Sequence, residues 1–199
     1  MIDLYTERLY ITDLRESDDS FIMKLLNSVG WLKFIGDKNI GSIEAAEEYI
    51  KKIRETPEMV YTVVQTREGA EAMGIVTLVK KDYLPDHDLG FAFLNDFHGQ
   101  GFAFEACWTV LEYALTNLYT HVSAVVLPDN EKSIRLLVSL GFNFVGAIKN
   151  ANEELLHYRI SNAKVVVSIF FVSFQFFSFL LFNFFFIVKA IYLSTLITR

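Results

Sequence analysis

Two glycines, Gly99 and Gly101, lie between the end of an expected strand and the start of an expected helix. A turn at such a place can direct several backbone N–H groups toward one point, and the helix N-terminus adds a partial positive charge. A pyrophosphate group is the ligand that suits such a turn. The spacing differs from the dinucleotide-binding fingerprint, and no Gly-Lys-Ser/Thr follows as in a P-loop. On these residues alone, glycines that only form a turn are the alternative interpretation.

The elements that must position this turn follow one another irregularly along the chain. A strand, Asp88–Leu94, leads into the turn, and a long amphipathic helix, Phe102–Asn117, leaves it. The other expected elements are, in order, a strand Arg8–Leu14, a helix with its N-cap at Ser17, a helix Ile43–Arg54 with its N-cap at Ser42, a hairpin of Val60–Thr66 and Ala72–Lys80, a strand His121–Leu127, a helix Glu131–Leu140, and strands Asn143–Lys149 and Glu154–Ile160. This order predicts an α+β fold, because a doubly wound sheet would alternate strand and helix regularly.

The charge of the chain excludes some classes of function. The net charge is −6, and residues 1–163 hold 15 basic and 24 acidic groups, a balance of −9. Sequence-independent nucleic-acid binding needs the opposite balance. The single cysteine, Cys107, is interpreted as a core residue of a cytoplasmic protein. The four histidines (His87, His98, His121, His157) lack metal-site spacing, so no metal is expected.

Residues 162–199 form a hydrophobic tail of a different composition. Val165–Val188 is an uncharged run of 24 residues between Lys164 and Lys189, and a membrane-spanning helix needs about 20. The interpretations are a C-terminal membrane anchor, a non-native extension, and a helix for the core or for dimerisation. An anchor would make the cytoplasmic protein membrane-associated.

Several motifs in residues 1–161 resemble the GNAT superfamily of N-acetyltransferases, in particular its ribosomal-protein-N-terminal-acetyltransferase-like branch. The motifs occur in the order found in that branch. They are Thr6-Glu-Arg-Leu9, Trp31-Leu-Lys-Phe-Ile-Gly-Asp37, Asp88-Leu-Gly-Phe-Ala-Phe93, His98-Gly-Gln-Gly-Phe-Ala103, and Pro128-Asp-Asn-Glu-Lys-Ser-Ile-Arg-Leu-Leu137 followed by Gly141-Phe142. The resemblance covers about four-fifths of the chain.

The resemblance implies a mixed, mostly antiparallel sheet with flanking helices, in which the fourth and fifth strands of the family splay apart and acetyl-CoA binds between them. The backbone of the fourth strand would pair with the pantetheine arm, and the N–H groups of the loop would hold the pyrophosphate. The residues expected to bind acetyl-CoA are Phe91, Ala92, Phe93, His98, Gly99, Gln100, Gly101, Phe102, Ala103 and Asn130. His98 stands where many superfamily members carry Gln or Arg.

The implied reaction is direct attack of a primary amine, on a protein N-terminus or a small molecule, on the acetyl thioester. Many members carry a tyrosine acid where this chain has Leu137, so Ser133 is the substitute donor to the thiolate. Helix capping is an equal interpretation for Ser133 and Asn130. Asp88 is the expected base, with ordered water as its alternative. The competing function is a catalytically idle acyl-CoA-binding or interaction module, which the tail would tether to a membrane if it is an anchor.

Overall fold

The strands form one sheet in the computed structural model, which describes residues 2–69, 71–151 and 153–162. The sheet has eight strands in the order β1-β2-β3-β4-β5-β6-β8-β7. The strands are β1 (Asp3–Tyr5), β2 (Leu9–Asp13), β3 (Met59–Thr66), β4 (Ala72–Val79), β5 (Asp88–Phe93), β6 (His121–Val126), β7 (Asn143–Asn150) and β8 (Glu153–Ser161). Each neighbouring pair is antiparallel except β5 and β6, which are parallel and share the single pair Asp88–Ser123. The predicted mixed, mostly antiparallel sheet is therefore confirmed.

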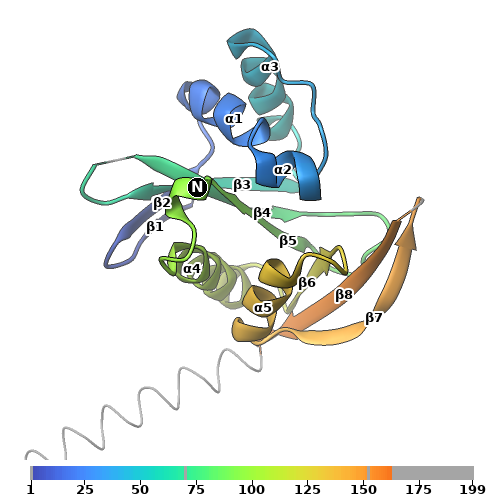
Figure 1. Ribbon diagram of the computed structural model, residues 1–199. Coiled ribbons are helices and arrows are strands. Elements are labelled where there is room, and N and C mark those ends of the chain that lie inside the picture. Colours follow the sequence, from blue (N-terminus) through green and yellow to red (C-terminus); the bar gives the residue numbers. More distant parts are fainter. Residues whose placement is uncertain (1, 70, 152, 163–199) are drawn as a thin grey trace, which may run out of the picture. The chain divides into compact units, whose positions relative to one another are not determined.

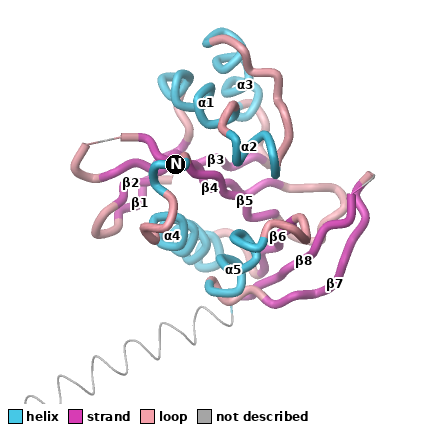
Figure 2. Tube along the Cα trace, viewed as in Figure 1, coloured by secondary structure: helices cyan, strands magenta, loops and turns pink. Residues whose placement is uncertain are grey.

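Helices cover both faces of this sheet (Figures 1 and 2). One layer consists of α1 (Asp19–Leu26), α2 (Val29–Phe34) and α3 (Ile43–Arg54), and the other of α4 (Phe102–Asn117) and α5 (Glu131–Ser139). Two short 3-10 helices, Glu16–Asp18 and Asn95–Phe97, precede α1 and α4. The sheet therefore separates α2 and α3 from the helix that follows the glycine turn.

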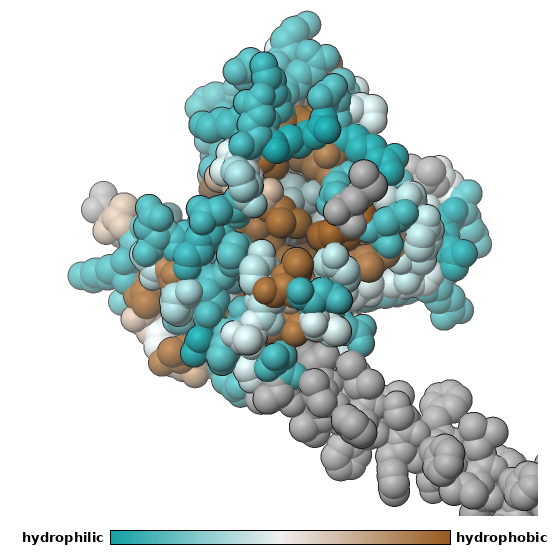
Figure 3. Space-filling model, turned by 180° about the vertical axis from the view of Figure 1, so that it is seen from behind, coloured by the Kyte–Doolittle hydropathy of each residue, from teal (hydrophilic) through white to brown (hydrophobic). Residues whose placement is uncertain are grey.

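Each helical layer buries its own apolar side chains against the sheet. Leu25, Trp31 and Ile50 pack with Val63 and Ile75 of the central strands. On the opposite face α4 buries six side chains, Ala106, Cys107, Val110, Leu111, Ala114 and Leu115. Burying one large aliphatic side chain contributes about 1.5–3 kcal/mol, so both layers are held mainly by these contacts. From behind, the α1–α3 layer is polar outside, and apolar surface gathers in a hollow below it (Figure 3).

Most predicted elements lie where the residue pattern placed them, and two short ones were missed. The helices Ile43–Arg54 and Phe102–Asn117 have the predicted bounds, and Ser42 Oγ accepts a hydrogen bond from the Ala45 N–H at 3.2 Å. Strand β1 and helix α2 were not predicted. With three and six residues they are too short to show a periodic pattern.

The predicted N-cap at Ser17 is wrong. Ser17 lies inside the 3-10 turn Glu16–Asp18, and α1 begins only at Asp19. Asp18 takes the turn-closing role, because its carboxylate accepts a hydrogen bond from the Arg15 N–H at 2.7 Å. The extra turn moves the N-cap of α1 one residue along the chain, from Ser17 to Asp18.

Residues Met1–Ser161 form one compact unit. The uncharged run Val165–Val188 lies outside the described residues. The membrane anchor, the non-native extension and the core or dimerisation helix therefore all remain open interpretations of the tail. Among the helices that the structure describes, none combines the length and hydropathy needed to span a bilayer.

Candidate active site

Strands β5 and β6 separate directly after their one shared pair. The Ser123 N–H donates to the His87 carbonyl at 2.9 Å. Backbone groups alternate in direction along a strand, so those of Phe91 and Phe93 face the space where β6 has turned away. An extended, amide-containing chain could pair with β5 there as a strand would.

The glycine turn lies at the end of β5. Gly99 and Gly101 have φ values of +75° and +81°, which glycine adopts without a steric cost. The first hydrogen bond of α4 runs from the Glu105 N–H to the Gly101 carbonyl at 3.1 Å. The N–H groups of Phe102 to Phe104 come before it and have no acceptor within the helix. These donors and the positive end of α4 form a site that favours a phosphate.

The side chain of His98 turns back onto β5. Its Nε2 lies 3.0 Å from the Phe93 carbonyl oxygen. This contact fixes the loop to the strand. It also occupies the carbonyl of Phe93, one of the three residues expected to pair with the pantetheine arm. The backbone of Phe91 is left as the main pairing position.

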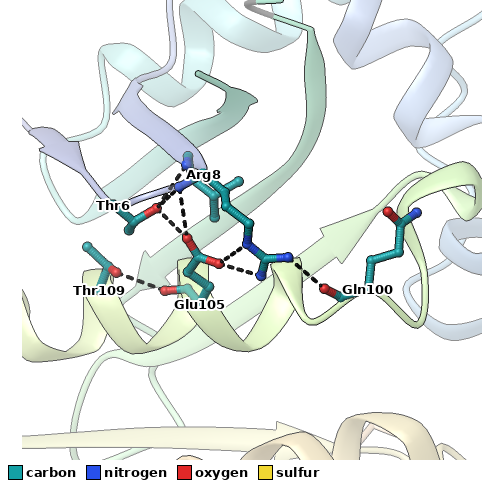
Figure 4. Close-up of polar contacts among 6 residues, drawn as sticks. Thr6, Arg8, Gln100, Glu105 and Thr109 are labelled. Atoms are coloured by element: carbon teal, nitrogen blue, oxygen red, sulfur yellow. Dashed lines mark hydrogen bonds and ion pairs between the residues drawn. The ribbon is translucent and has the colours of Figure 1, made fainter. Parts of the chain in front are cut away.

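A cluster of side chains from distant parts of the sequence holds the loop (Figure 4). The Arg8 guanidinium donates to Glu105 through Nε at 2.7 Å and through Nη2 at 2.5 Å. Its Nη1 donates to the Gln100 carbonyl at 3.0 Å, and Thr6 Oγ1 donates to Glu105 Oε1 at 2.5 Å. We name Thr6, Arg8, Gln100 and Glu105 the loop clamp. Arg8 also lies over the Phe102 ring, 4.4 Å from its centroid.

Sequence reasoning did not find the loop clamp. No role was assigned to Glu105 from the sequence, and Arg8 was included only as part of the Thr6–Leu9 motif. Burial alone would raise the pKa of Glu105, but the bonds from Thr6 and Arg8 hold that pKa below its ordinary value. Glu105 therefore stays ionised and paired at neutral pH.

The N-terminus of α5 forms the opposite wall. Asn130 is the N-cap residue of α5, and its Oδ1 accepts a hydrogen bond from the Ser133 N–H at 3.2 Å. The capping interpretation of Asn130 is thus confirmed. Ser133 Oγ has no hydrogen-bond partner within the described part of the chain, and Leu137, where many superfamily members carry tyrosine, is buried. The hydroxyl of Ser133 is therefore an uncharged polar group of this helix that is not engaged by another described residue.

Asp88 lies at the point where the two strands part, and it is only 6% exposed. Its carboxylate contacts Lys81 Nζ at 2.7 Å and accepts a hydrogen bond from the Val125 N–H at 3.0 Å. Burial raises the pKa of Asp88 above its ordinary value, against the opposing effects of Lys81 and Val125. For Lys81, burial would lower the pKa, but Asp88 more than offsets this and raises it.

A cleft of about 1320 Å³ joins these parts. It is lined by the predicted residues Asp88, Phe91, Ala92, Phe93, His98, Gly99, Gly101, Phe102, Ala103, Asn130 and Ser133. Gln100 does not line it, because its side chain donates to the Asp96 carbonyl at 2.9 Å and its own carbonyl accepts from Arg8. The cleft continues between β4, β5 and the α1–α3 layer, where Trp31, Tyr49 and Tyr61 line it.

Other candidate residues lie outside the cleft. The His87 ring stacks on Tyr119 with centroids 4.2 Å apart, and Cys107 is fully buried, which raises the pKa of its thiol. Within the ranges described, no group of three or more His, Cys, Asp or Glu side chains is placed to hold a metal ion.

The comparison with known families decides what this arrangement is. Residues 8–143 match the model of the acetyltransferase (GNAT) domain. The chain belongs to the GNAT acetyltransferase family. The matched range includes Arg8, Gln100 and Glu105 of the loop clamp, both strands of the splayed pair and the whole of α5.

Two curated relatives are named as uncharacterized N-acetyltransferases. The N-acetyltransferase YoaA of Bacillus subtilis is 26% identical over 153 residues, which cover 73% of this chain and 85% of the relative. The N-acetyltransferase p20 of Bacillus licheniformis is 25% identical over 156 residues, covering 75% and 87%. This GNAT protein is therefore an acetyltransferase by family and by its relatives.

Solved structures show the same fold. The ribosomal-protein-S5-alanine acetyltransferase of Vibrio fischeri matches with a TM-score of 0.71 at 17% identity, covering 81% of this chain and 97% of the other. The spermidine N-acetyltransferase of Vibrio cholerae, solved with CoA and spermine, matches with a TM-score of 0.69 at 21% identity, covering 81% and 99%. GNAT enzymes use acetyl-CoA, and the open edge of β5 beside the glycine loop fits an amide-containing chain that ends in a pyrophosphate.

Proposed function

We propose that this enzyme transfers the acetyl group of acetyl-CoA to a primary amine by direct attack, at the gap between β5 and β6. The observation that carries the proposal is the continuity of the gap with the loop of Gly99 and Gly101 in one cleft. The phosphates would be held by the N–H groups that follow Gly99, and the arm would lie along the backbone of Phe91. Bound acetyl-CoA would supply the activated acetyl group.

Asp88 is the residue that we propose as proton acceptor. An α-ammonium has a pKa of about 8, so near neutral pH it first loses one proton to water and becomes the free amine. Its nitrogen must lose a second proton as it bonds to the acetyl carbon, and this second proton is the one that Asp88 would accept. The raised pKa of Asp88 makes it a better acceptor than a surface carboxylate, and Lys81 fixes its orientation at 2.7 Å. Ordered water in the cleft is the alternative acceptor.

Ser133 is the residue that we propose as donor to the departing sulfur. As the amine nitrogen bonds to the acetyl carbon, the carbon–sulfur bond breaks and the thiolate needs a proton or a hydrogen bond. Ser133 lines the cleft, and its backbone N–H donates a hydrogen bond to the Asn130 cap. A hydroxyl in this position would donate to the thiolate, the role that a tyrosine acid has in many superfamily members.

Free thiol release from acetyl-CoA, measured with and without amine acceptors, tests the proposal. The panel should contain peptides with free N-termini, free amino acids and polyamines. We expect release that depends on the acceptor. Stabilisation by acetyl-CoA without release for any amine would instead identify the idle acyl-CoA-binding module.

A further inference from the structure

We infer that the acceptor of this enzyme is an amine that also carries carboxylate groups, and not a polyamine. The inference rests on the proposed function, because it concerns the acceptor side of the same cleft. It is carried by the charged side chains that line the cleft and by which of them are already paired.

The cleft is basic although the chain is acidic. Its charged lining consists of six cations, Lys33, Lys38, Lys52, Lys81, Lys132 and Arg135, and two carboxylates, Asp88 and Glu153. The chain as a whole has a net charge of −6. The local reversal of sign favours an anionic ligand on electrostatic grounds.

Apart from Lys81, which is paired with Asp88, the cations belong to two groups on different elements. Lys132 and Arg135 lie on α5, in the layer that contains the glycine loop, where phosphates would bind. Lys33 lies on α2, Lys38 follows that helix, and Lys52 lies on α3. The layer of α2 and α3 lies on the opposite face of the sheet (Figure 1). We name Lys33, Lys38 and Lys52 the acceptor-side lysines.

The acceptor-side lysines are not neutralised by the protein. All three are exposed, and none forms an ion pair with another described residue. Lys33 Nζ lies over the Phe34 ring, 4.6 Å from its centroid. By contrast, Lys81 is paired with Asp88, and Arg135 with Glu131 at 3.1 Å. The positive charges of the acceptor-side lysines are therefore available to a ligand.

A polyamine would find almost no partner here. It keeps further ammonium groups charged when one amine reacts, and each needs a carboxylate. Asp88 is engaged by Lys81 and Val125, so Glu153 is the remaining carboxylate among the described lining residues. The spermidine acetyltransferase with which this chain shares its fold was solved with spermine, but the charges of this cleft oppose such a ligand.

Initial rates with matched acceptors test the inference. Two peptides with the same free N-terminal serine, followed by glutamates in one and lysines in the other, should be compared with spermidine and free glutamate. We expect the KM for the acidic peptide to be on the order of tenfold lower than for the basic one, since each of three exposed charge pairs favours the acidic peptide modestly. Added salt should reduce the difference. A lower KM for free glutamate than for the acidic peptide would identify a small carboxylate-bearing amine as the acceptor.

Charge reversal assigns the effect to the lysines. In the variant Lys33→Glu/Lys38→Glu/Lys52→Glu the preference should disappear or invert, while the KM for acetyl-CoA stays within about twofold of the wild type. The control Lys24→Glu/Lys51→Glu/Lys149→Glu has the same change in net charge at exposed lysines outside the cleft. The control should keep the preference.

Each contrary outcome has a distinct meaning. Better acetylation of spermidine or of the basic peptide by the wild type overturns the acceptor class and leaves the proposed function standing. A rise in the KM for acetyl-CoA alone in the triple variant assigns the lysines to the phosphates and overturns the inference. Absence of thiol release with every amine contradicts the proposed function, and the inference falls with it.

Discussion

Asp88 combines two properties that a surface carboxylate lacks. It is buried, which raises its pKa, and it is held by Lys81 and by a backbone N–H from β6. Burial without partners would leave the acid protonated, and partners without burial would leave it a weak base. The combination keeps Asp88 oriented at the splay point and able to titrate above the ordinary carboxyl range.

The pH dependence of kcat/KM should reveal this titration. Below the pKa of the acceptor amine, log kcat/KM should rise with slope one as pH increases. Below the raised pKa of Asp88 the slope should become two, because protonation then removes the base as well as the free amine. In Asp88→Asn the slope should stay at one and the rate fall by about 10²–10⁴-fold.

Ser133→Ala is the matched control for that experiment. It should lower kcat, since the thiolate loses a donor, but it should leave the change of slope in place because Asp88 still titrates. An Asp88→Asn enzyme that keeps both its rate and its second slope would exclude Asp88 as the base and favour water.

Among the elements, the loop before α4 depends on β2 as much as on its own glycines. The Gln100 carbonyl and Glu105 are both held by Arg8, which directly precedes β2. A Cβ at Gly101 would lie 3.5 Å from Arg8 Nη2, at a φ value that side chains rarely adopt. The shape of the phosphate loop is therefore set by contact with another element.

Arg8→Lys should separate positioning from folding. Lysine keeps the charge but lacks the planar fork that reaches Glu105 and Gln100 together. We expect the KM for acetyl-CoA to rise roughly tenfold, about 1.4 kcal/mol, with a smaller change in kcat. Arg54→Lys is the control, because Arg54 pairs with Glu16 at 2.6 Å on the surface far along the chain from the loop.

Both variants should melt within a few degrees of the wild type. If Arg8→Lys lowers the melting temperature and leaves the KM for acetyl-CoA unchanged, the loop clamp serves stability and not cofactor binding.

The sequence was informative wherever the signal is local. Ser42 and the spacing of Ala46, Ile50 and Ile53 define α3 without help from the fold, and the glycine turn is one contiguous stretch. The loop clamp joins residues 97 positions apart, and the acceptor-side lysines meet only when α2 and α3 pack on the sheet. Such contacts have no pattern along the chain, so sequence reasoning could not find them.

At the scale of the whole molecule, we propose that residues 1–161 carry the activity. A chain ending at Ala163 should fold, acetylate a soluble acceptor at the full-length rate, and gain about 2.7 kcal/mol of stability from acetyl-CoA at 100 times its Kd. Circular dichroism melting and the thiol assay measure these outcomes. Loss of folding on truncation would show that residues after 163 belong to the core.

The same pair of proteins tests the tail. If Val165–Val188 is an anchor, the full-length chain should fractionate with membranes and resist carbonate extraction, and the shortened chain should not. Aggregation of the full-length chain in place of insertion would favour a non-native extension.

The contact between Arg8 and Gln100 also has a consequence for how the enzyme matures. It spans 92 residues of chain, so it closes a long loop whose entropy must be lost before the contact forms. Until β2 has docked beside β3, the glycine turn lacks the contact that shapes it. During folding, the loop before α4 can therefore reach its phosphate-binding shape only after Arg8 and β2 have come into contact with it.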